Sequence, residues 1–78
     1  MQSSLSHTTK QIIGERIKFF REKNNLTLQE LGDLIGAEKQ YVWSLEKGMK
    51  NIKLDALDKI ISALNCKHED FLHTNPNN

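Results

Sequence analysis

The sequence predicts a small all-α domain, and three observations support this class. Apolar residues recur at helical spacing, with Ile13, Ile17 and Phe20 at positions i, i+4 and i+7. A later segment opens with a capping box, in which Thr27 is followed by Glu30 three residues on. No segment shows the strict apolar–polar alternation that is typical of a strand. A chain of 78 residues that is 37% hydrophobic is sufficient for one such domain.

Local signals predict where the first two helices end. The first should span about residues 9–23, because Asn24-Asn25 interrupts the helical pattern. The second should begin after Thr27 and end at Gly36, a residue suited to the left-handed C-cap. A helix of about eight residues is unstable alone, so its neighbours must hold it.

Three more helical segments are expected. The third helix should run from near Glu38 to Gly48. The fourth has an apolar side made of Leu54, Leu57, Ile61 and Leu64. Asn65 should close the fourth helix, and a last helical turn should bring Phe71 back to the core.

Composition and chain ends exclude several classes. We expect disordered tails at 1–8 and 73–78 around an ordered domain at 9–72. Neither a signal peptide nor a membrane-spanning apolar run is found. The single cysteine, Cys66, allows no internal disulfide and no cysteine-rich zinc site. We therefore expect a cytoplasmic protein without membrane association, metal or cofactor.

The net charge is only +1, but the charges are segregated. Residues 1–23 hold five basic and two acidic residues, and residues 39–53 hold four lysines and one acidic residue. Residues 24–38 hold three acidic residues and no basic one. This segregation favours binding to a polyanion, with ordinary solvated faces as the alternative.

Two short helices joined by a tight glycine-containing turn form a helix-turn-helix unit. Gly32 stands where the second and third helices must approach closely, and Gly36 supplies the positive φ of the turn. Val42 and Leu45, spaced i and i+3, should press the third helix onto the core. The sequence therefore predicts this unit at the centre of the domain.

From about Ile13 to Leu72 the chain resembles the phage repressor and Cro-like, or XRE-type, helix-turn-helix transcription regulators. The resemblance rests on an ordered set of motifs: Ile13-Gly14-Glu15-Arg16-Ile17 with Arg21, Leu26-Thr27 with Glu30-Leu31, Val42 with Leu45-Glu46-Lys47-Gly48, and Leu64-Asn65 with Phe71-Leu72. It implies a compact five-helix lambda-repressor-like domain that binds double-stranded DNA.

Two charged residues are expected on apolar helix faces. Glu46 lies four residues from Val42, and Arg21 lies four residues from Ile17. Either charge alone would be costly there, whereas the two can form a partly buried ion pair. The resemblance implies the same pair, which holds the first helix against the third.

The outward face of the third helix carries side chains suited to base edges. Lysine can donate to guanine O6 and N7, and glutamine pairs with adenine N6 and N7. The resemblance places base contacts at Lys39, Gln40 and Ser44, with Glu38 as a fourth candidate. An ordinary solvated helix face is the alternative.

Contacts with the DNA backbone are expected around this helix. The candidates are Thr27 and Gln29 at the start of the second helix, Tyr41 beside the base-contacting residues, and Lys47, Lys50 and Asn51 after the third helix. The chain departs from the family at Leu28, where glutamine is common, and at Ile52, where proline is common. Leu28 calls one phosphate contact into question. We expect Trp43 to be half exposed, at the core edge or against the groove wall.

Other classes of function find little support. His7, His68 and His73 lie in the tails or the last turn, and no nucleophile has a base and an orienting group, so we expect no enzyme. The resemblance places Cys66 at an apolar position of the family, so it should be an inert buried thiol, with a redox sensor as the alternative. A protein-interaction module of the antitoxin type is the alternative, and the short tails argue against it.

The sequence-level hypothesis is a stand-alone regulator, most simply a repressor, that binds an inverted-repeat operator as a homodimer and takes no small-molecule ligand. One domain reads too few base pairs to select a site. The expected dimer patch comprises Ile60, His68, Phe71 and Leu72. For Phe71, a role in the monomer core is an equal alternative.

Overall fold

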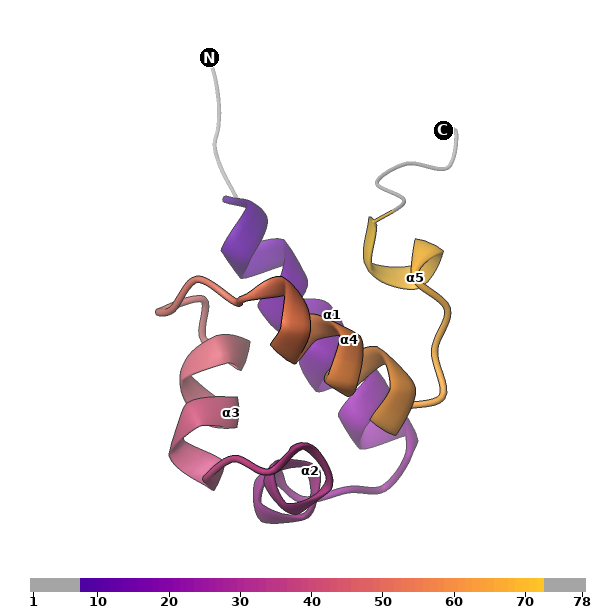
Figure 1. Cartoon of the computed structure of the whole chain (residues 1–78). Helices are drawn as coiled ribbons and strands as arrows, with labels where there is room; N and C mark the ends of the chain where they lie inside the picture. Colours follow the sequence, from indigo (N-terminus) through magenta and orange to yellow (C-terminus); the bar gives the residue numbers. More distant parts are fainter. Residues whose placement is uncertain (1–7, 73–78) are drawn as a thin grey trace.

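The computed structural model describes residues 8–72, which form five helices and no strand (Figure 1). The helices are α1 (Thr9–Lys23), α2 (Leu28–Ile35), α3 (Lys39–Glu46), α4 (Leu54–Ala63) and α5 (Glu69–Leu72). The all-α prediction is confirmed. Of the tails expected at 1–8 and 73–78, residues 1–7 and 73–78 lie outside the described residues.

Short-range capping explains where the first helices begin. The hydroxyl oxygen of Thr27 accepts a hydrogen bond from the Glu30 backbone N–H at 3.0 Å, and the Glu30 carboxylate accepts one from the Thr27 N–H at 2.8 Å. This confirms the predicted capping box. Thr8, expected in the tail, forms the same type of box with Gln11 and caps α1.

The helix-turn-helix unit is formed by α2, a three-residue connection and α3. Gly36 ends α2 with φ at +75°, as predicted. A Cβ atom on Gly32 would lie 2.6 Å from the Ala37 carbonyl oxygen and 3.3 Å from the Glu38 carbonyl carbon. The connection can therefore pass this close to α2 only because residue 32 is glycine.

The core lies between α1, the helix-turn-helix unit and α4. Its fully buried side chains come from all of these elements and are Ile17, Leu31, Val42, Ile60 and Leu64. The close crossing of α1 and α3 depends on Gly14, a requirement that the sequence did not reveal. A Cβ atom at Gly14 would lie 2.7 Å from the Glu46 carbonyl oxygen and closer still to that of Leu45.

The structure corrects two sequence-based expectations for the C-terminal part and decides a third that was left open. Leu54, expected on the buried side of α4, is the first residue of that helix and is 77% exposed, because no element covers it there. Ile60, expected in an exposed dimer patch, is completely buried. Phe71 is also buried, with its ring centroid 5.7 Å from that of Phe20. Both side chains therefore belong to the monomer core.

What remains of the predicted dimer patch is small. His68 is exposed, and its Nε2 atom lies 3.4 Å from Oδ1 of Asp58. The side chain of Leu72 lies outside the described residues. Of the three patch residues whose side chains the structure describes, only His68 is exposed.

Candidate nucleic-acid interface

A buried ion pair holds α3 in place. Arg21 Nε and Nη2 donate to the two carboxylate oxygens of Glu46 at 2.6 and 3.0 Å, and the side chains are only 12% and 5% exposed. These hydrogen bonds raise the pKa of Arg21, although burial opposes the shift. Arg21 Nη1 also donates to the Leu26 carbonyl oxygen at 2.8 Å. The predicted pair therefore connects α1, α3 and the segment that enters α2.

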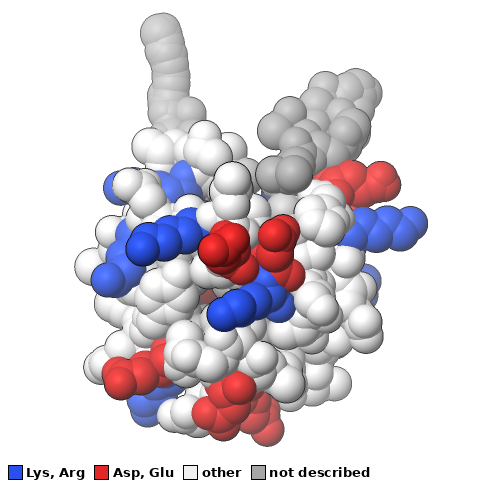
Figure 2. Space-filling model, viewed as in Figure 1, with Lys and Arg blue, Asp and Glu red and all other residues white. Residues whose placement is uncertain are grey.

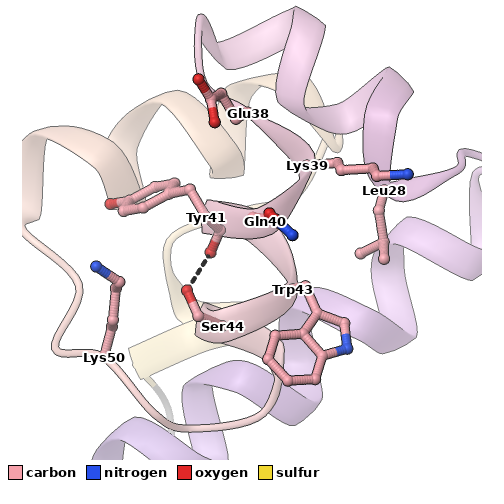
Figure 3. Close-up of a pocket in the computed structure, with 8 residues that line it drawn as sticks. All are labelled: Leu28, Glu38, Lys39, Gln40, Tyr41, Trp43, Ser44 and Lys50. Atoms are coloured by element: carbon pink, nitrogen blue, oxygen red, sulfur yellow. Dashed lines mark hydrogen bonds between the residues drawn. The ribbon is translucent and has the colours of Figure 1, made fainter.

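The first turn of α3 faces solvent. Lys39 and Gln40 are exposed, and so is Glu38, the N-cap residue, whose side chain makes no capping hydrogen bond. We call these three residues the reading face. Figure 3 shows them around a hollow of about 670 Å³ that is also lined by Leu28, Tyr41, Trp43, Ser44 and Lys50.

Ser44 does not share this exposure, so the expectation that it lies on the outer side of α3 was wrong. Its side chain is 8% exposed, and its hydroxyl donates a hydrogen bond to the Tyr41 carbonyl oxygen at 2.8 Å (Figure 3). Ser44 directly precedes the core residue Leu45, and it lies at the inner edge of the hollow. Its polar group is thus engaged within α3 and is not presented to a ligand.

The residues expected at the DNA backbone differ in how available they are. Thr27 uses its hydroxyl in the capping box, and Gln29 Nε2 donates to Asp33 Oδ1 at 2.9 Å. The side chains of both are therefore engaged. By contrast, Lys50 and Asn51 are exposed in the loop after α3.

Tyr41 and Lys47 frame the same helix. Tyr41 is half-buried and lines the hollow on the side of Lys50 (Figure 3). Lys47 is exposed, and its Nζ atom lies 5.9 Å from the ring centroid of Trp43. Trp43 is 43% exposed, which agrees with the expectation of half exposure.

The only expectation for Leu28 was that it calls one phosphate contact into question. In the structure Leu28 is half-buried and lines the same hollow as Trp43, next to Lys39. The signal that could have indicated this was the apolar residue at 28, where the resemblance implies glutamine, together with a large aromatic residue at 43 that was expected to be half exposed. Their proximity depends on how α2 and α3 cross, which the sequence alone does not show.

Acidic and basic side chains lie on different parts of the domain. Figure 2 shows basic side chains over the loop between α3 and α4, and acidic ones at the edge formed by α2. The sequence agrees, because α2 contains Glu30 and Asp33 and no basic residue, whereas Lys47, Lys50 and Lys53 follow α3. Lys50 of the basic loop lines a hollow with the three residues of the reading face, and Asp33 of α2 lines another hollow with the same three residues.

Residues 8–72 provide neither a membrane-spanning helix nor a cluster of metal ligands. No helix there is both long and apolar enough to cross a lipid bilayer. The same residues contain no group of three His, Cys, Asp or Glu side chains that could hold a metal ion.

A short capped helix, a tight turn and a second short helix with an exposed polar face define a helix-turn-helix protein. The chain belongs to the HTH_3 helix-turn-helix family, which matches residues 17–71.

Relatives and solved structures agree with this assignment. An uncharacterized HTH-type transcriptional regulator of Archaeoglobus fulgidus is 42% identical over 56 residues, which are 72% of this chain and 79% of that protein. The control protein C.SmaI of Serratia marcescens is 32% identical over 56 residues, which are 72% of this chain and 67% of that protein. The crystal structure of the clp gene regulator ClgR from Corynebacterium glutamicum superposes with a TM-score of 0.82 at 25% identity, over 86% of this chain and 71% of that one.

Proposed function

We propose that this protein is a transcription regulator that binds double-stranded DNA sequence-specifically, with α3 in the major groove. The observation that carries the proposal is the exposed pair Lys39 and Gln40 on the first turn of α3. In helix-turn-helix proteins the N-terminal residues of the second helix contact base edges. The relatives named as transcriptional regulator and control protein support the same class of function.

The reading face supplies complementary chemistry. The Lys39 ammonium can donate to guanine O6 and N7, the Gln40 amide can pair with adenine N6 and N7, and the Glu38 carboxylate can accept from cytosine N4. Ser44 is left out of this set because its hydroxyl is already used. Each bidentate contact reads one base, so the reading face of one domain should distinguish the bases at about two to three base pairs.

Contacts with phosphates position the helix. Lys50 and Asn51 follow α3 on one side, and Lys47 and Tyr41 flank it. On the other side, the contact at Thr27 and Gln29 comes from the backbone N–H groups in the first turn of α2. These groups contribute affinity and its salt dependence, not sequence preference.

The regulator acts as a homodimer on an inverted repeat, most simply as a repressor that occupies a promoter. A single reading face cannot select one site among the many competing sites of a genome. Two copies related by a two-fold axis place their α3 helices about 34–36 Å apart, one turn of DNA. With Ile60 and Phe71 in the core, DNA itself must contribute much of the pairing, because the exposed remainder of the expected patch is small.

Selection of bound duplexes from random DNA, followed by sequencing and mass measurement on the selected duplex, tests this function. We expect a two-fold symmetric site that binds two chains. One chain per duplex with an asymmetric site would overturn the dimer. Equal binding of selected and random duplexes would overturn DNA reading and favour the interaction-module alternative.

A further inference from the structure

Leu28 and Trp43 form an apolar surface directly beside the reading face. Leu28 is the first residue of α2, and Trp43 lies in the middle of α3. Both line the hollow at the reading face, and both also line a second hollow beside the Arg21–Glu46 pair. Figure 3 shows them on the same side of α3 as Lys39.

The positions of these residues tie them to base reading. Trp43 follows Lys39 by four residues and Gln40 by three, so the three side chains share one face of α3. If Lys39 and Gln40 contact bases, a group of a neighbouring base therefore lies next to the indole ring. Leu28 comes from α2 and lines the same hollow as Trp43 and Lys39 (Figure 3).

The base edges in the major groove offer one apolar group that could pack against the surface formed by Leu28 and Trp43. The edges of the bases there carry hydrogen-bonding atoms, except for the methyl group on C5 of thymine. The same position carries a methyl group in 5-methylcytosine. An ammonium or an amide does not match a methyl group, whereas a leucine side chain and an indole ring do.

We propose that Leu28 and Trp43 form a seat for the C5-methyl group of a pyrimidine, adjacent to the base that Lys39 reads. The proposal rests on the proposed function, because it requires α3 to lie in the major groove. It adds a second mode of discrimination to the hydrogen bonds of the reading face.

Replacing one base at a time in the selected duplex tests the seat with the wild-type protein. Deoxyuridine in place of one thymidine removes the methyl group and leaves every hydrogen-bonding atom of the base. At the seat, this should raise Kd about fourfold, the effect of one buried methyl-sized group. Where the seat meets a cytosine instead, 5-methylcytosine should lower Kd by a similar factor. These two arms identify which pyrimidine is bound.

Variants assign the effect to these two residues. Trp43→Ala and Leu28→Gln should bind the methylated and unmethylated forms of the duplex equally. Leu34→Ala provides a matched control, since Leu34 is a 58% exposed leucine of α2 outside both hollows. This control should keep the full effect. Trp43 is the single tryptophan of the chain, so its fluorescence should also respond to the methyl group in the wild-type complex.

The outcomes separate the two proposals. If the selected duplex is preferred over random DNA but no pyrimidine replacement changes Kd, the methyl seat is overturned and DNA reading stands. If the methyl effect persists in both Trp43→Ala and Leu28→Gln, it arises elsewhere and the assignment is overturned. If no duplex is preferred, the proposed function fails, and the seat fails with it.

Discussion

Arg21 and Glu46, 25 residues apart in the chain, form two parallel hydrogen bonds between α1 and α3. The bond from Arg21 Nη1 to the Leu26 carbonyl oxygen extends this contact to the start of the helix-turn-helix unit. One guanidinium therefore connects α3 both to α1 and to the segment that enters α2. The orientation of the reading face depends on a residue that lies outside that face.

Removal of Glu46 should destabilise the domain strongly. Glu46→Ala leaves the Arg21 charge in a site where its side chain is 12% exposed, at a cost of about 3–5 kcal/mol. Thermal and denaturant unfolding measure this change. Glu22→Ala, at an exposed acid next to Arg21, is the control and should change stability by less than about 0.5 kcal/mol. Equal melting temperatures for Glu46→Ala and the wild type would contradict a structural role of the pair.

Gly14→Ala should destabilise the protein although alanine is the better helix former. The new methyl group would lie 2.7 Å from the Glu46 carbonyl oxygen, and a backbone atom cannot rotate away. We expect a loss of about 1–3 kcal/mol, as for overpacked cores. Ser62→Ala, at an exposed position of α4, is the control and should be neutral or slightly stabilising. A higher melting temperature for Gly14→Ala would show that α1 and α3 can separate at little cost.

Lys39 and Gln40 should affect specificity, whereas Lys50 should affect affinity. Alanine at position 39 or 40 should relax preference at one base position by about 1–3 kcal/mol. Lys50→Ala should weaken all duplexes alike and lower the salt slope by about one. Titrations of selected and mismatched duplexes at several salt concentrations measure both quantities. Lys67→Ala is the control for loss of one positive charge, because Lys67 lies between α4 and α5.

Ser44→Ala tests whether Ser44 contacts bases or lies outside the reading face. Its hydroxyl is bonded to the Tyr41 carbonyl oxygen, so its loss should leave base preference unchanged. Repeating the site selection with this variant measures the effect. A changed preference at a single base position would restore Ser44 to the reading face.

The thiol of Cys66 should react slowly with thiol reagents. Burial raises its pKa, Asp70 adds to the shift and Lys23 opposes it, and Sγ lies 3.5 Å from the Leu64 carbonyl oxygen. Because the folded state disfavours the thiolate, its contribution to stability is present below the unfolded-state pKa of about 8.5 and is lost as pH rises through the folded-state value. A thiol reagent at pH 8 should therefore react more slowly with folded than with denaturant-unfolded protein. Equal rates would contradict a protected thiol.

Features set by near neighbours in the chain were predictable. The capping box of Thr27 and Glu30 and the left-handed Gly36 involve residues at most four positions apart. A short segment of sequence therefore contains every residue that takes part in each of these features. The Arg21–Glu46 pair was also predictable, because a charge on an apolar helix face requires a partner. These signals determine that the chain forms short helices with a turn between them.

Exposure at the edges of helices was decided by tertiary structure. Ser44 and Ile60 were expected at the surface, yet α3 turns the first inward and the core encloses the second. For Phe71 the surface and the core were equal alternatives, and the packing against Phe20 decides for the core. The place of Leu28 beside Trp43 likewise results from the crossing of α2 and α3. The spacing of residues determines which side chains share a helix face, whereas the angle and closeness of the helices determine which of those faces water reaches.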